Sequence, residues 1–273
     1  MSFDLKILEG EDIPVDLLEI PQPPKKLYLC GNLPREDLIC LAVVGSRKCT
    51  TYGKDTVKKL ISGLKGYPIA IVSGLAVGID SFAHETALDA GLFSLAFPGS
   101  GISEKSLYPI SNLFLAEKII TAGGCVISEF PPEMKAELYT FPMRNRLMAG
   151  ISKAALIIEA QEKSGTLITA RMALDYNKEV LAVPGPINSE YSKGIFSKKR
   201  KMQKITFLFN SYSGFEAHSI IDTIVNDLNK SGIQMLSVRS SKNVKQIYSQ
   251  GFVNPNDNIQ PSVRVSNPIG FRR

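Results

Sequence analysis

The chain has 273 residues, of which 44% are hydrophobic and 21% charged, the ordinary composition of a globular protein with a sizeable core. No apolar run reaches the roughly 18–20 residues that span a bilayer, and the acidic N-terminus lacks the basic-then-apolar pattern of a signal peptide. The four cysteines form no CxxC pair and have only two histidines as companions, which argues against a disulfide framework and a zinc site. We therefore expect a cytoplasmic protein with reduced cysteines and no membrane partner.

The net charge of +6 suggests a nucleic-acid partner, but it is unevenly distributed along the chain. Residues 1–194 have a net charge of −2, whereas residues 195–273 have a net charge of +8. A nucleic-acid site in the first part must therefore come from local clustering of cations, because the average there is slightly acidic.

In chain order, residues 1–25 are a short lead-in that ends in a stiff, proline-rich stretch. From residue 26 to 194, short apolar runs alternate with helix-length patterns. The expected strands are 38–44, 69–72, 92–97, 125–127, 154–158 and 179–183, and the expected helices are roughly 53–65, 79–90, 110–122, 143–151 and 166–177. This alternation predicts an α/β fold with a Rossmann-like, mostly parallel sheet and helices on both faces.

Short glycine-bearing segments follow most of the predicted strands. Because the carboxyl ends of parallel strands meet at one edge of a sheet, these segments should meet where such folds bind ligands. Glycine lets a ligand approach the backbone closely, and a helix N-terminus adds partial positive charge. The sequence thus predicts an edge that binds anions or nucleotides, formed by Arg47, Ser73, Gly74, Gly78, Ser164, Gly165 and Thr166.

One short string places an aromatic ring beside two guanidinium groups. Phe141, Arg144 and Arg146 together offer a stacking surface and phosphate ligands, which is the combination that a sequence-tolerant single-strand site needs. Three alternatives stay open: Phe141 is a core aromatic, Arg144 belongs to a surface ion pair, or one arginine pairs with Glu129 or Glu159 to hold the site together.

Several polar residues near this edge have an architectural interpretation. Asp80 lies near a helix start and is expected to cap backbone N–H groups there. Asn145 is expected to cap or cross-link backbone, and Glu129 and Glu159 to support the architecture rather than bind metal. His84 lies in a helical pattern among apolar residues and is expected to be packed and neutral.

A series of strings occurs in order at consistent spacing: PPKKLY (23–28), VVGSR (43–47), SGLAVGID (73–80), YP (108–109), SEFP (128–131), FPMRNR (141–146), SGTLITA (164–170) and VPG (183–185). Over about residues 20–194 they resemble the DNA-processing protein A family, also called DprA or Smf. The resemblance implies an extended Rossmann-like domain that binds single-stranded DNA, usually as a homodimer. It also implies that the protein passes the strand to the RecA recombinase and shields it from nucleases during natural transformation.

The rival interpretation is a nucleotide-binding or nucleotide-converting enzyme with the related phosphoribohydrolase-like fold. Those enzymes are similar to lysine-decarboxylase-like proteins and carry a Gly-Gly-x-Gly-Thr-x-x-Glu string whose glutamate does acid–base work. Here Thr169 stands in the place of that glutamate, and a threonine cannot act as an acid or base near neutral pH. We therefore favour DNA binding without catalysis and without a cofactor.

The family pattern continues beyond the equivalent of Gly194 with an asparagine, a Leu-Ile pair and a Gly-Ala pair. This chain instead reads IFSKKRK (195–201). We expect residues 195–273 to be an atypical, basic and partly disordered tail. It is either a lineage-specific extension or the product of a shifted reading frame near codon 195.

Overall fold

The computed structural model describes residues 4–183, 185, 189–191, 193–196 and 206–207. In these residues one sheet of nine strands has the order β1-β2-β6-β5-β4-β3-β7-β8-β9. The strands are β1 (Leu5–Glu9), β2 (Lys26–Gly31), β3 (Ile39–Gly45), β4 (Ile69–Ser73), β5 (Phe93–Ala96), β6 (Cys125–Ser128), β7 (Ala154–Ile158), β8 (Glu179–Ala182) and β9 (Thr206–Phe207). In this spatial order, all neighbouring strands in the stretch β6-β5-β4-β3-β7-β8-β9 are parallel. At the other end of the sheet, β2 is antiparallel to both of its neighbours, β6 and β1.

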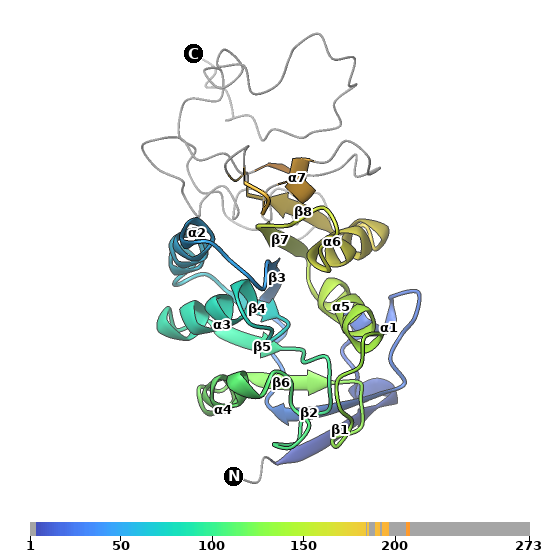
Figure 1. The fold of residues 1–273 in the computed structure, drawn as a ribbon. Helices are drawn as coiled ribbons and strands as arrows, with labels where there is room; N and C mark the ends of the chain where they lie inside the picture. The colour runs from blue at the N-terminus through green and yellow to red at the C-terminus, as the bar shows by residue number, and fades with distance from the viewer. Residues whose placement is uncertain (1–3, 184, 186–188, 192, 197–205, 208–273) are drawn as a thin grey trace, which may run out of the picture.

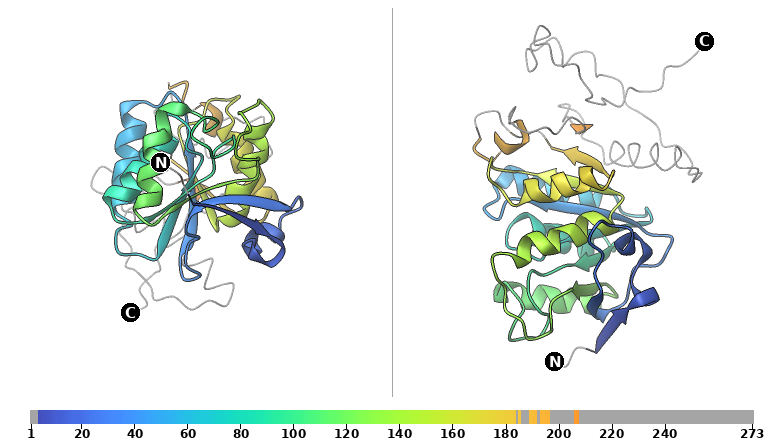
Figure 2. Two further views of the ribbon diagram at one scale, coloured as in Figure 1. Left: turned by 90° about the horizontal axis from the view of Figure 1, so that it is seen from below. Right: turned by 90° about the vertical axis from the view of Figure 1, so that its right-hand side faces the viewer.

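Helices cover both faces of the sheet. Figures 1 and 2 show α2, α3 and α4 on one face and α1, α5 and α6 on the other. Their bounds are α1 (Val15–Leu18), α2 (Thr51–Ser62), α3 (Ile79–Asp89), α4 (Leu113–Thr121), α5 (Thr140–Ile151), α6 (Thr166–Asp175) and α7 (Lys193–Phe196), with 3-10 turns η1 (Gly10–Asp12) and η2 (Ile110–Asn112). Strands β4 and β7 are buried along their whole length, because helices cover both of their sides, and their sequences are accordingly apolar without polar alternation.

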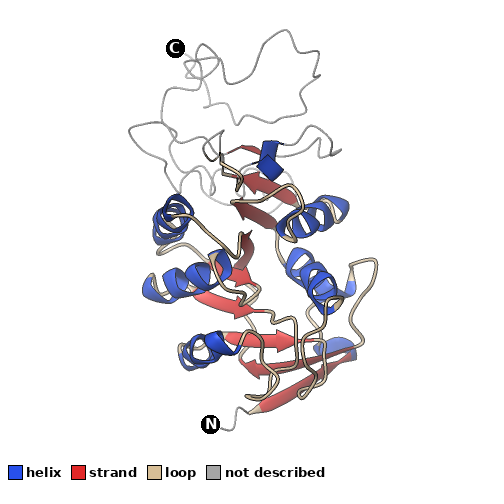
Figure 3. Ribbon diagram, viewed as in Figure 1, coloured by secondary structure: helices blue, strands red, loops and turns tan. Residues whose placement is uncertain are grey.

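The predicted α/β fold is confirmed, and the alternation of strands and helices is visible in Figure 3. Helix boundaries move by a few residues for local reasons. Helix α2 begins at Thr51 because the side chain of Thr50 accepts a hydrogen bond from the N–H of Gly53 at 3.2 Å, which caps the helix. Helix α4 begins only at Leu113, because residues 110–112 form the 3-10 turn η2 instead.

The N-terminal segment is part of the sheet rather than a lead-in to it. Strand β1 forms the sheet edge by pairing with β2, a strand that the sequence analysis did not single out. Helix α1 lies beside α5, and the side chains of Leu8, Ile13 and Leu17 are buried in the same core as those of α5. Residues 4–25 are therefore part of the domain and not a separate lead-in. Residues 1–3 lie outside the described residues.

The other predicted boundary, at residue 194, is crossed by the sheet. Strand β9 lies beyond it and pairs in parallel with β8, Leu181 opposite Thr206. The remainder of the predicted tail, 197–205 and 208–273, lies outside the described residues.

Candidate nucleic-acid interface

The segments that follow β3, β4 and β7 meet at the carboxyl edge of the sheet, and hydrogen bonds tie them together. After β3, the carbonyl of Ser46 accepts from the N–H of Ile79 at 3.1 Å. After β7, the hydroxyl of Thr166 donates to the carbonyl of Gly45 at 3.0 Å. Loops from three strands thus form one connected surface, as the positions of the glycine-bearing segments predict.

The two glycines after β4 serve contacts between loops. Gly78 has φ +86°, and a Cβ there would overlap the carbonyl of Ser46, so both its conformation and its surroundings require glycine. Gly74 is buried, and a Cβ there would overlap Nη1 of Arg144. Ser73 is fully buried and donates to the carbonyl of Val43 at 2.6 Å. Ser73 and Gly74 are therefore internal, not residues that a bound strand can touch.

Arg144 is a buried cation and not a free phosphate ligand. It is 5% exposed, and its Nη1 donates to the carbonyls of Gly74 and Phe97, which follow β4 and β5. Burial lowers the pKa of Arg144 to about 10, although the nearby Asp80 carboxylate opposes that shift, so the side chain stays charged at neutral pH. It ties two strand ends together and places a positive charge just beneath the loops.

Asp80 accepts a hydrogen bond from the N–H of Gly74 at 3.1 Å. This N–H belongs to the loop before α3, so Asp80 fixes that loop instead of capping the first turn of its own helix, whose N-cap is Gly78. Burial raises the pKa of the Asp80 carboxyl, and the positive charge of Arg144 opposes the shift. Asp80 and Arg144 thus hold the same glycine loop from two sides.

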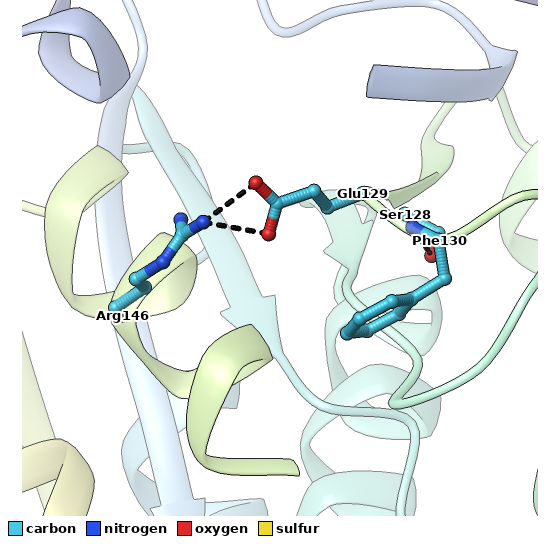
Figure 4. Close-up of polar contacts among 4 residues, drawn as sticks. All are labelled: Ser128, Glu129, Phe130 and Arg146. Atoms are coloured by element: carbon cyan, nitrogen blue, oxygen red, sulfur yellow. Dashed lines mark hydrogen bonds and ion pairs between the residues drawn. The ribbon is translucent and has the colours of Figure 1, made fainter. Parts of the chain in front are cut away.

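Arg146 pairs with Glu129. Its Nη2 lies 2.6 Å from both carboxylate oxygens, as Figure 4 shows, and Arg146 is only 6% exposed. The loop that carries Glu129 is itself fixed, since the N–H of Phe130 donates to the hydroxyl of Ser128 at 3.0 Å. Of the two roles that the sequence leaves open for Arg146, the structure places it in an ion pair that joins α5 to the end of β6.

Asn145 and Glu159 also join neighbouring elements. The Asn145 side chain donates to the carbonyl of Gly165 at 3.5 Å, which links α5 to the start of α6. Glu159 follows β7 at φ +56° and accepts from both the N–H and the hydroxyl of Thr50, the N-cap of α2. Thr166 is buried, whereas Ser164 is half-buried and Gly165 is exposed.

The first N–H groups of the edge helices already have acceptors in the protein. At α6 the N–H of Thr166 donates to the hydroxyl of Ser164 at 3.1 Å, and at α3 the N–H of Ile79 donates to Ser46. The N–H groups of Thr166 and Ile79 are therefore not free to bind an anion. The side chain of Arg47 adds an exposed positive charge at this edge.

Arg47 and Phe141 form the exposed part of the predicted site. The guanidinium carbon of Arg47, an exposed residue, lies 4.8 Å from the centroid of the Phe141 ring, a cation–π contact. Phe141 is half-buried, and its ring also meets that of Tyr108 edge-on, with centroids 5.9 Å apart. Sequence reasoning gave Tyr108 no role, although an aromatic residue shortly after a glycine-bearing strand end was a usable signal.

Two residues that could support acid–base or hydroxyl chemistry, His84 and Thr169, are buried. His84 is fully buried, its Nδ1 lies 2.7 Å from the hydroxyl of Ser94, and burial lowers its pKa to about 3, so it is neutral. Thr169 is also buried. Across the described residues there is no cluster of three or more metal-ligating side chains and no helix long and apolar enough to cross a membrane. All four cysteines are free thiols.

Comparison with known proteins gives consistent matches. The family model for DNA recombination-mediator protein A matches residues 5–207. Protein Smf of Escherichia coli is 39% identical over 186 residues, which cover 68% of this chain and 49% of that protein. This chain thus spans about half the length of that relative.

Two solved structures have the same fold. The structure of DNA processing protein A from Streptococcus pneumoniae matches with a TM-score of 0.69 and 32% identity, covering 80% of this chain and 74% of that one. The Helicobacter pylori protein, whose structure describes a single-stranded DNA binding mode, matches with a TM-score of 0.70 and 28% identity, covering 83% and 98%. The sequence analysis predicts that the resemblance ends at residue 194. That prediction is wrong, because the family match continues to residue 207. By this match, its relatives and its fold, the chain belongs to the DNA recombination-mediator protein A family.

Proposed function

We propose that this protein binds single-stranded DNA with little sequence preference at the carboxyl edge of its sheet. The observation that carries the proposal is the contact between Arg47 and Phe141, an exposed cation against a half-buried ring. A single strand offers the two matching groups, a phosphate for the guanidinium and an unpaired base for the ring. On binding, a base takes the place of the guanidinium on the ring, and Arg47 turns to a phosphate.

The buried charges favour the same surface. Arg144 is cationic beneath the loops, and the Asp80 carboxylate partly offsets its charge. Gly165 is exposed and Ser164 half-buried at the start of α6, so the backbone there is open to a passing strand. In this arrangement Arg47 contacts phosphate directly, while Arg144 acts through its field and by holding the loops. The DNA-binding mode described for the Helicobacter pylori relative supports the same ligand class.

The finer parts of the proposal rest on the family. We propose that the protein works without catalysis and without a cofactor, as a homodimer that protects incoming DNA in the cytoplasm and loads the RecA recombinase onto it. Light scattering of the full chain tests for the dimer. A strand-exchange assay with RecA, run with and without this protein, tests for loading. Released base from nucleoside monophosphates would instead favour a nucleotide-converting enzyme.

A matched pair of variants tests the site. Arg47→Ala and Lys118→Ala each remove one exposed cation stacked on a phenylalanine, because Lys118 lies 4.7 Å from the Phe114 ring on α4. Binding of a labelled oligo-dT is measured by fluorescence anisotropy over a salt series, together with thermal melting. We expect Arg47→Ala alone to weaken binding and to reduce the slope of log K against log salt by about 0.7.

Phe141→Ala completes the test. It should raise the free energy of binding by about 1–3 kcal/mol if a base stacks on the ring. Equal binding by wild type, Arg47→Ala and Phe141→Ala, all of them folded, would move the site away from this edge. A collapse of thermal stability in Phe141→Ala would instead mean that the ring serves the core.

A further inference from the structure

Tyr108 is more exposed than the ring it touches. It is 48% exposed, whereas Phe141 is half-buried. The Phe141 ring is flanked on several sides: the guanidinium of Arg47 lies over it, and a Cβ at Gly99 would come within 2.5 Å of it. In the described structure Tyr108 therefore presents the more open aromatic surface at this edge.

The backbone around Tyr108 is held firmly although its side chain is exposed. Its N–H donates to the hydroxyl of Ser100 at 3.0 Å, and Ser100 is fully buried. Four residues later the side chain of Asn112, itself buried, donates to the carbonyl of Leu75 and the hydroxyl of Ser81, each at 2.8 Å. An exposed ring on a fixed backbone loses little conformational entropy when it binds a ligand, which is how binding sites are preorganised.

We propose that Tyr108 is a second base-stacking residue, so that Phe141 and Tyr108 each take one base of the strand. This inference rests on the proposed function and goes beyond it by naming the feature of the ligand that the site recognises. The two rings are inclined at 61°, with centroids 5.9 Å apart. Bases that stack on these rings cannot be parallel to each other, so the strand must unstack and turn between them. A single strand does this readily, whereas a duplex holds its bases stacked and paired.

The test compares variants on two ligands of the same length, an oligo-dT and an abasic deoxyribose-phosphate oligomer that has no bases to stack. Tyr108→Ala removes the ring, and Tyr108→Phe keeps it. Ile110→Ala is the matched control, because Ile110 is a nearby exposed apolar residue, 64% exposed, without a ring. Thermal melting of each variant checks that it is folded.

We expect Tyr108→Ala to raise Kd for oligo-dT by about 5- to 150-fold, the ~1–3 kcal/mol of a base stack converted at ~1.4 kcal/mol per tenfold. Its Kd for the abasic oligomer should stay within about twofold of wild type, and Tyr108→Phe and Ile110→Ala should bind both ligands like wild type. The double variant Tyr108→Ala/Phe141→Ala should bind oligo-dT more weakly than Phe141→Ala alone.

Three results would overturn the inference: an unchanged Kd for oligo-dT in Tyr108→Ala, an equal loss on both ligands, or a double variant no weaker than Phe141→Ala. The last would mean that Tyr108 only positions Phe141. Wild-type protein that fails to bind oligo-dT at all would instead refute the proposed function, so the two failures are distinguishable.

Discussion

The ion pair between Arg146 and Glu129 predicts a loss of stability that is separate from any effect on DNA. Glu129→Gln keeps the size of the side chain but removes its charge. The substitution leaves the guanidinium of Arg146 without its carboxylate partner, although the Arg146 side chain is only 7% exposed. The Nη1 atom of Arg146 already has no hydrogen-bond partner among the described residues. Removing one partner of a buried pair costs about 3–5 kcal/mol because the other charge stays buried and unpaired.

The magnitude should lie at the lower end of that range. The Glu129 side chain is 17% exposed, so water screens part of the interaction, and we expect a loss of about 3 kcal/mol. In a domain of this size each kcal/mol lowers the melting temperature by roughly 2–4 °C, which gives a decrease of roughly 6–12 °C. Replacing both partners with apolar residues, in Glu129→Leu/Arg146→Met, should recover most of the loss, because no charge is then left buried.

Differential scanning calorimetry measures the melting temperatures, and oligo-dT anisotropy below the melting transition measures binding. We expect Glu129→Gln to melt early and to bind like wild type while folded. A Glu129→Gln variant that melts like wild type would refute the structural role of the pair. Normal melting of Arg146→Met with weakened binding would assign Arg146 to the DNA.

Two further predictions concern buried residues at the same edge. The pKa of His84 is lowered to about 3 by burial, against about 6.5 when unfolded. The neutral, buried His84 therefore contributes its full stability above pH ~6.5, and this stability is lost as pH falls toward 3, by up to ~1.4 kcal/mol per pH unit. In urea titrations, the free energy of unfolding of His84→Gln should fall less steeply with decreasing pH than that of wild type. Gly74→Ala should destabilise by about 1–3 kcal/mol, because its Cβ overlaps Arg144. Gly165→Ala, whose Cβ meets no atom within 4 Å, should leave the urea midpoint unchanged or raised; equal midpoints in both variants would contradict the overlap.

The central elements of the fold follow from the sequence because their signals are local. Apolar runs such as 154–158, bounded by turn residues and alternating with helical patterns, identify buried parallel strands without further information. Strand β1 gives no such signal, since four of its five residues are exposed and its place depends on pairing with β2. Its recognition needs contacts between distant parts of the chain.

The sequence predicts which segments lie at the candidate site, but not how deeply their side chains are buried. The order of strands and loops places the glycine segments and the FPMRNR string at one edge. Whether an arginine in that string faces water or protein depends on partners 17 to 70 residues away, the Glu129 carboxylate and the carbonyls of Phe97 and Gly74. Sequence spacing carries no information about those contacts, which is why Arg144 and Arg146 resembled free phosphate ligands.

The frameshift near codon 195 stays a prediction, and two findings bear on where the family-like part of the chain ends. The family match extends to residue 207, and β9 adds to the sheet beyond the expected break. Translating the encoding DNA in the other two frames after codon 194 tests it. An asparagine, a Leu-Ile pair and a Gly-Ala pair in quick succession in either frame would support the shift, and their absence from both would refute it.

The most direct test of the central claim is the affinity of the full chain for a labelled oligo-dT against the same strand annealed to its complement. Residues 195–273, with a net charge of +8, attract both ligands, so the comparison is made at about 0.2 M salt, where that attraction is reduced. Stacking on Phe141 and Tyr108 requires unpaired bases. We predict clearly tighter binding of the single strand, and equal affinity for the two ligands would contradict the proposal.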